Sequence, residues 1–175
     1  MYLICPGIHE LELTNQFINN TFNKSDNLLV FPIDKYPAYS GFHILQFLQE
    51  NCKNTSQELM IISFSAGVVG AINAAWLWQL KGGTIKGLIA FDGWGVPLIS
   101  NFPIYRVSHD EFTHWSSAIL GTGNLSFYAD PSVEHLELWG SPHRVKGWMV
   151  ETNSHGKKFL SAMTLIEFLT LILKD

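Results

Sequence analysis

The apolar residues of this chain gather in short runs, separated by polar turns and by longer stretches with helical periodicity. Six of these runs are rich in β-branched and aromatic side chains and therefore predict strands. They span residues 2–5, 28–31, 59–64, 87–91, 104–107 and 125–128. Because the runs are apolar almost throughout rather than alternating, we expect the strands to be covered on both faces.

Helical periodicity alternates with these runs and predicts four helices, at residues 11–22, 42–48, 67–80 and 161–174. The segment 67–80 is apolar nearly all round, so we expect it to pack deeply against the sheet. This alternation predicts an α/β fold, a three-layer sandwich around a mostly parallel six-stranded sheet. Residues 1–175 are expected to form a single domain.

Composition narrows the classes of protein that this chain can represent. A hydrophobic fraction of 47% with 15% charged residues is typical of a globular protein. The formal net charge of −4 and the lack of a Lys/Arg cluster argue against nucleic acid and anionic membranes as partners. No run reaches the roughly 18 apolar residues of a membrane span. The apolar start lacks a basic region and ends at Pro6-Gly7, so it predicts a first strand rather than a signal peptide.

The two cysteines, Cys5 and Cys52, fall in a predicted strand and at a predicted helix end. We expect both to be free, buried thiols, although a disulfide or a catalytic thiol is the alternative. Free thiols favour a cytoplasmic location.

One short segment carries the main chemical signal. The strand at 59–64 ends in Ser63-Phe64-Ser65-Ala66-Gly67, and a helical pattern follows immediately. A strained strand-to-helix turn would expose the Ser65 hydroxyl, and it requires small residues two positions before and after the serine. Ser63 and Gly67 meet that need. A second match to the same spacing, at residues 152–156, has no predicted strand before it.

The segment resembles the nucleophile elbow of the α/β-hydrolase superfamily, G-x-S-x-G, with Ser63 in place of the first glycine. In length the chain is similar to small members without a lid domain, such as small bacterial lipases and cutinases. The resemblance implies a serine hydrolase that cleaves a small-molecule ester or thioester, without cofactor or metal. It also implies the chain order of serine, acid and histidine.

The activating base must take the proton of the serine hydroxyl. His135 lies just beyond the last predicted strand, in a Val-x-His-Leu-x-Leu segment that resembles the histidine loop of small bacterial lipases. We therefore expect His135 to be the base. His109 and His155 are the rivals, and a surface histidine at a helix start is the alternative for His135.

The orienting acid is expected to follow a late strand. Asp110 comes directly after the fifth predicted strand and is the expected acid. Asp92, after the fourth strand, and Asp130, after the sixth, are its rivals. Most loop aspartates are turn or N-cap residues, and that alternative applies to all three.

An oxyanion hole needs two backbone N–H donors. Ala66, which follows the nucleophile at the start of a helix, would supply one, and Ile8, in the loop after the first strand, would supply the other. That loop contains Pro6-Gly7 where the superfamily has His-Gly. His9 either contacts the substrate or is simply exposed.

Other clusters point to weaker alternatives. His109 and His114 are five residues apart and do not share a helix face, so we expect no metal site there. Trp94, Trp115 and Trp139 either pack in the core or form an apolar wall for the substrate.

Two hypotheses from other classes remain beside the hydrolase. One is a non-catalytic α/β-hydrolase-like protein that binds a ligand, because the loop after the first strand departs from the family pattern. The other is a flavodoxin-like nucleotide-binding protein with a similar order of strands.

Overall fold

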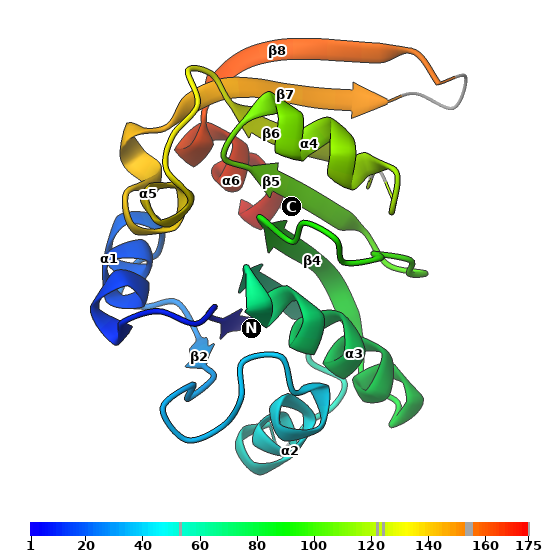
Figure 1. Cartoon of the computed structure of the whole chain (residues 1–175). Coiled ribbons are helices and arrows are strands. Elements are labelled where there is room, and N and C mark those ends of the chain that lie inside the picture. The colour runs from blue at the N-terminus through cyan, green and yellow to red at the C-terminus, as the bar shows by residue number, and fades with distance from the viewer. Residues whose placement is uncertain (53, 122, 124, 153–155, 175) are drawn as a thin grey trace.

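The structure is a computed structural model that describes residues 1–52, 54–121, 123, 125–152 and 156–174. Within these ranges the sheet has eight strands in the order β2-β1-β3-β4-β5-β6-β7-β8 (Figure 1). The strands are β1 (Tyr2–Cys5), β2 (Leu28–Val30), β3 (Leu59–Phe64), β4 (Ile85–Phe91), β5 (Ile104–Ser108), β6 (Leu125–Ala129), β7 (Lys146–Thr152) and β8 (Lys158–Thr164). The α/β class is therefore confirmed.

Strands β1 to β6 pair in parallel, whereas β7 runs antiparallel to β6 and β8 antiparallel to β7. The prediction of a six-stranded sheet was wrong, because it omitted β7 and β8. Both strands carry charged and polar residues, and most of β8 is exposed at the edge of the sheet. A strand that buries little apolar surface lacks the continuous apolar run on which the prediction relied.

The described residues form six α-helices. They are α1 (Leu11–Thr21), α2 (Gly41–Asn51), α3 (Ala66–Leu80), α4 (Glu111–Ala118), α5 (His135–Gly140) and α6 (Leu165–Lys174). A short 3₁₀ turn, η1 (Pro142–Arg144), follows α5. Residues 161–164, predicted as the start of the last helix, instead belong to β8. The short helices α4 and α5 were not predicted, since neither is long enough for a clear apolar period.

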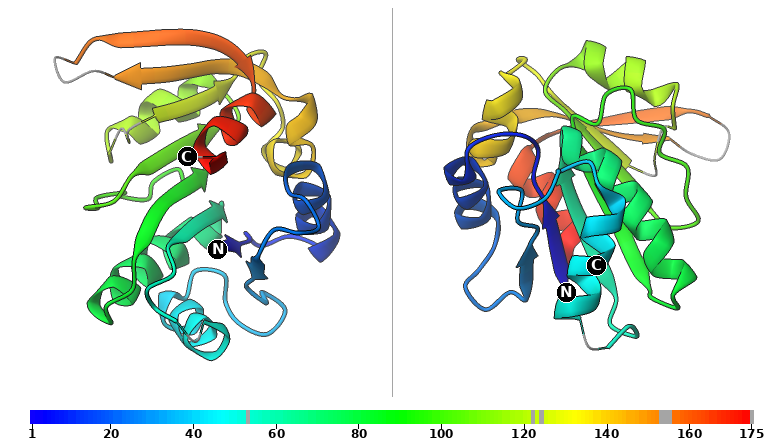
Figure 2. Two further views of the ribbon diagram at one scale, coloured as in Figure 1. Left: turned by 180° about the vertical axis from the view of Figure 1, so that it is seen from behind. Right: turned by 60° about the horizontal axis from the view of Figure 1, so that its bottom comes forward.

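Helices cover both faces of the sheet (Figures 1 and 2). On one face, α2 and α3 enclose a core cluster that includes Leu3, Ile61 and Leu88. On the other face, α1, α5 and α6 enclose a second cluster that includes Ile62 and Phe127. Alternate residues of the same central strands thus point into two separate cores, which explains why those strands are apolar almost throughout.

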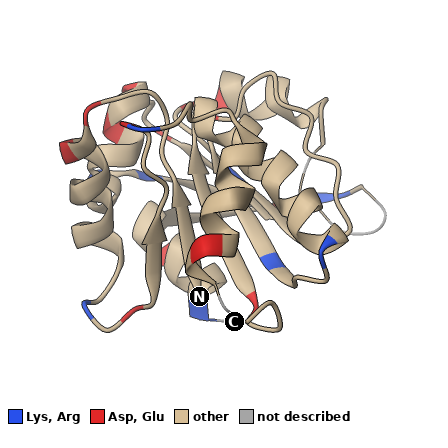
Figure 3. Ribbon diagram, turned by 90° about the horizontal axis from the view of Figure 1, so that it is seen from below, with Lys and Arg blue, Asp and Glu red and all other residues tan. Residues whose placement is uncertain are grey.

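No helix within the described residues is long and apolar enough to span a membrane. Seen from below, Lys and Arg are scattered over several elements, as are Asp and Glu (Figure 3).

One polar pair is buried between α4 and β6. His114 is only 7% exposed, and its Nε2 lies 2.9 Å from the Ser126 hydroxyl. Burial, together with the positive charges of Lys158 and Arg106, lowers the pKa of His114 to about 4. The imidazole is therefore neutral in the folded protein at neutral pH.

We expect this histidine to make the folded state less stable in acid. Between its ordinary pKa near 6.5 and its folded value near 4, the unfolded chain binds a proton that the folded chain excludes, so the free energy of unfolding decreases as the pH falls. Urea unfolding measures the free energy of unfolding at pH 7.5 and at pH 5. The decrease between these two pH values should be smaller in His114→Gln than in the wild-type protein, by about 2 kcal/mol. Identical pH dependence in the two proteins would contradict the assignment.

Candidate active site

The backbone at Ser65 has the strained conformation that the sequence predicts. Ser65 has φ 51° and ψ −122°, a region that non-glycine residues rarely adopt. Its N–H donates to the carbonyl of Phe91 at the end of β4 (2.9 Å), which ties the turn to the neighbouring strand. Although Ser65 is the N-cap residue of α3, its side chain forms no capping hydrogen bond. The hydroxyl is thus left for another partner.

The small residues around Ser65 have clear steric roles. A Cβ on Gly67 would lie 2.4 Å from the carbonyl oxygens of Cys5 and Pro6, so α3 starts in direct contact with the loop after β1. A Cβ on Gly7 would lie 3.0 Å from the Ser65 Cβ. Ser63 replaces glycine without conflict, because its buried hydroxyl donates to the Ile89 carbonyl on β4 (3.1 Å).

Asp92, directly after β4, is the centre of the hydrogen-bond network at this edge of the sheet. With φ 47°, it and Ser65 are the only non-glycine residues with positive φ in the described part of the chain. Its side chain is 2% exposed. Oδ1 accepts from the backbone N–H of His109 (3.0 Å), and Oδ2 accepts from Nδ1 of both His109 (2.8 Å) and His135 (2.7 Å). Ser65 is near this network in the fold, because its N–H donates to Phe91, the residue before Asp92.

His135, the first residue of α5, packs on the residue that precedes the strained serine. Its ring stacks on Phe64, with centroids 4.6 Å apart and an angle of 26° between the planes. Phe64 directly precedes Ser65 and rests in turn on the buried ring of Trp139. Because Nδ1 donates to the Asp92 carboxylate, Nε2 carries the lone pair in the neutral ring.

His109, the expected rival of His135, joins the same cluster. Besides its two hydrogen bonds to Asp92, its carbonyl accepts from the N–H of Val133 in the loop that precedes α5 (3.0 Å). His109 thereby ties the loop that carries His135 to the end of β5. Its Nε2 faces the Asp110 carboxylate at 3.5 Å.

Asp110, the predicted acid, has a different set of contacts. It is the N-cap of α4 and accepts from the N–H of Thr113 (2.6 Å). Burial tends to raise the pKa of this carboxyl, but the hydrogen bonds from Thr113 and the proximity of His109 outweigh burial and lower it. No hydrogen bond or ion pair joins Asp110 to His135 among the described residues. The structure thus pairs His135 with Asp92, one of the two rivals of Asp110.

The remaining rivals are Asp130 and His155. Asp130 accepts a hydrogen bond from the Trp148 indole (2.9 Å) on β7. His155 and Ser154, the serine of the second motif match, lie outside the described residues.

The expected oxyanion donors are free. Ile8 is 76% exposed in the loop after β1, and Ala66 is the first residue of α3. Neither backbone N–H donates to another group within the ranges that the structure describes. His9 is partly buried against Phe64, with ring centroids 5.5 Å apart, so it is not simply exposed.

The Ser65 hydroxyl likewise forms no hydrogen bond with another described residue, His135 included. In proteins without substrate, the contact between a catalytic serine and its histidine is often long and shortens only in the complex.

Two hollows adjoin this cluster at the carboxyl ends of the strands. One, of about 280 Å³, is lined by Asp92, His109 and His135 together with Trp94, Phe112 and Thr113. The other, of about 320 Å³, lies between the loop after β1 and residues 33–39, and its lining includes Ile8, His9 and Tyr39.

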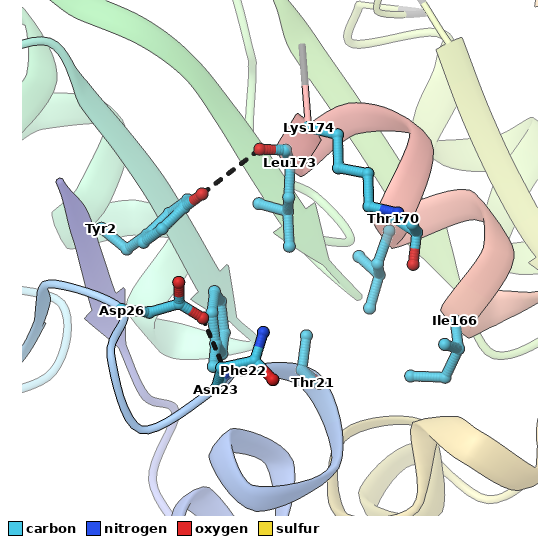
Figure 4. Close-up of a pocket in the computed structure, with 10 residues that line it drawn as sticks. Tyr2, Thr21, Phe22, Asn23, Asp26, Ile166, Thr170, Leu173 and Lys174 are labelled. Atoms are coloured by element: carbon cyan, nitrogen blue, oxygen red, sulfur yellow. Dashed lines mark hydrogen bonds between the residues drawn. The ribbon is translucent and has the colours of Figure 1, made fainter.

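A third hollow, of about 240 Å³, lies at the opposite edge (Figure 4). Tyr2, at the start of β1, donates to the Leu173 carbonyl there (3.2 Å). Because this hollow opens beside the amino end of β1, it is remote from Ser65.

Three of the tryptophans, Trp94, Trp115 and Trp139, differ in burial. Trp139 is fully buried and stacks on Phe17 at 3.7 Å. Trp94 and Trp115 are 65% and 51% exposed, and Trp94 lines the hollow beside His135. The core alternative therefore holds for Trp139, whereas Trp94 is placed as a wall of a candidate site.

The chain matches no model of a known protein family, and no curated protein sequence matches it significantly.

The close approach at Gly67 predicts that any side chain there disturbs the elbow. We expect Gly67→Ala to lower the free energy of unfolding by about 1–3 kcal/mol, because the added methyl must displace the backbone of the loop after β1. Val69→Ala, on the more open side of the same helix, should change it by less than about 0.5 kcal/mol. Equal urea midpoints for the two variants would show that the loop after β1 can move without a loss of stability.

Proposed function

We propose that the protein is a cytoplasmic serine hydrolase that cleaves a small ester or thioester through an acyl-enzyme. The observation that carries the proposal is the His135–Asp92 hydrogen bond (2.7 Å) next to a serine with strained, positive-φ backbone. Strained residues that the surrounding structure holds in place cluster at functional sites. A capless α/β-hydrolase-like arrangement agrees with the parallel strands and the short turns at this edge.

In this proposal Ser65 is the nucleophile, His135 the general base and Asp92 the orienting acid. His135 Nε2 takes the Ser65 proton as Oγ attacks the acyl carbon, and it then gives that proton to the leaving alcohol or thiol. Asp92 fixes the ring by accepting from Nδ1 and stabilises the imidazolium that forms. Water then attacks the acyl-enzyme by the same path in reverse and frees Ser65.

The backbone N–H groups of Ile8 and Ala66 would stabilise the negative charge that develops on the acyl oxygen. Their freedom from other partners supports this role. Ala66 directly follows Ser65, and the loop that carries Ile8 contacts the start of α3 at Gly67. The hollow lined by Ile8 and Tyr39 is well placed for the acyl group, and the hollow lined by Trp94 and Phe112 for the leaving group.

A second candidate is a non-catalytic ligand-binding protein of the same fold. The lack of a hydrogen bond from the Ser65 hydroxyl to His135 favours it. The following experiment separates the two, because a binding protein has no activated serine.

A fluorophosphonate probe should label the purified protein on Ser65, because only an activated serine attacks the phosphorus at a useful rate. We expect labelling to be lost in Ser65→Ala and retained in Ser56→Ala, an exposed serine before β3 at the opposite edge. Intact-mass spectrometry and gel fluorescence measure the labelling. A wild-type protein that stays unlabelled while a control esterase reacts would support the binding protein instead.

Asp92 and Asp110 can be compared directly as the orienting acid. Asp92→Asn should slow labelling by about 10³- to 10⁴-fold, because an amide at this position no longer favours the tautomer with Nδ1 protonated. Asp110→Asn retains an N-cap side chain for α4 and should slow labelling by less than about tenfold. If Asp110→Asn proves the more damaging change, Asp110 rather than Asp92 orients the base.

A further inference from the structure

The cluster around Asp92 has a geometry that the hydrolase alone does not require. One ring nitrogen from His109, one from His135 and a carboxylate oxygen from Asp92 all lie within 4.8 Å of one another. The serine mechanism needs one histidine on the acid, whereas here two histidines converge on the same oxygen. Two imidazoles and one carboxylate are a common ligand set for zinc.

The spacing of these atoms is close to that of a tetrahedral site. With metal–ligand bonds of about 2.1 Å, neighbouring ligand atoms stand about 3.4 Å apart. The two Nδ1 atoms are 2.8 and 2.7 Å from Asp92 Oδ2, so each contact must lengthen by about 0.6–0.7 Å to admit an ion. His109 and His135 are partly exposed, with side-chain accessibilities of 27% and 41%, so solvent reaches both rings.

Two surrounding groups resemble the outer shell of a metal centre. Ligating histidines usually have their far nitrogen near a carboxylate, and His109 Nε2 faces Asp110 at 3.5 Å. Ligating carboxylates are usually held by a further hydrogen bond, and Asp92 Oδ1 accepts from the His109 N–H. The hollow lined by Trp94 and Phe112 leaves the fourth position open to water.

We propose that Asp92, His109 and His135 form a binding site for one divalent zinc ion, and that the ion switches off the hydrolase. The second half of this statement rests on the proposed function. Coordination uses the Nδ1 lone pairs of His109 and His135, so each ring gives up the Nδ1 proton that it now donates to Asp92. From a neutral ring this proton moves to Nε2 by way of solvent, and from an imidazolium it leaves to solvent, with no change of oxidation state. His135 Nε2 is then protonated and cannot accept the Ser65 proton, so the metal and the triad exclude each other.

Isothermal titration of Zn²⁺ into EDTA-treated protein tests the site without reference to catalysis. We expect one ion per chain and at least a tenfold loss of affinity in His109→Asn, since even outer-shell changes cost about 10- to 100-fold. His143→Asn, an exposed histidine on η1, should bind as the wild type does. Circular dichroism confirms folding, and His109→Gln serves in place of a variant that fails to fold.

The outcomes for the metal site and for the hydrolase are separate. No binding to the wild-type protein, or binding that survives both His109 substitutions, overturns the site even if the probe labels Ser65. Binding that needs His109 establishes the site even if no probe reacts. Where both hold, saturating Zn²⁺ should slow labelling at least tenfold, and EDTA should restore it. Undiminished labelling with zinc bound overturns the inhibitory role.

Discussion

The buried carboxylate of Asp92 is the interaction on which the carboxyl edge of the sheet depends. It collects three hydrogen bonds, all from His109 and His135, and so connects the ends of β4 and β5 with the start of α5. A buried carboxylate without such donors would be strongly destabilising, because water no longer solvates it. The loops that carry His109 and His135 are therefore held in position by their hydrogen bonds to one carboxylate.

A second constraint is the strain at Ser65 and Asp92. Each adopts a positive φ immediately after a parallel strand, and each is held by a backbone hydrogen bond to the next strand: Ser65 to Phe91, and Asp92 to Val107 (2.8 Å). The sheet, buried between two cores, supplies the rigidity that keeps these turns in place. Hydrogen bonds to Asp92 hold His109 and His135 together, and both the proposed triad and the proposed metal site rest on this cluster.

Local sequence was sufficient for Ser65, because its strand, turn and helix are contiguous and its small neighbours reveal the steric demand. It also singled out His135, which follows β6. It favoured Asp110 over Asp92 because of the place that the family resemblance implies for the acid. Both aspartates follow a strand, and chain position alone does not say which carboxyl faces the histidine. Asp110 is followed by a helix that needs an N-cap, a local role that its spacing to Thr113 could have signalled.

The sheet also contains strands that the sequence predicts and strands that it does not. Strands β1 and β3 to β6 are largely apolar because both faces of the sheet are covered there, and that pattern is visible in each segment by itself. Strands β7 and β8 are stabilised by pairing with β6 and with each other, so their identity depends on residues distant in sequence. The sequence by itself determined the α/β class, most of the parallel strands and the strained turn at Ser65, since these follow from local periodicity and steric fit. Only the tertiary structure decided that Asp92 is the partner of two histidines, because hydrogen bonds between loops depend on which strand ends are neighbours.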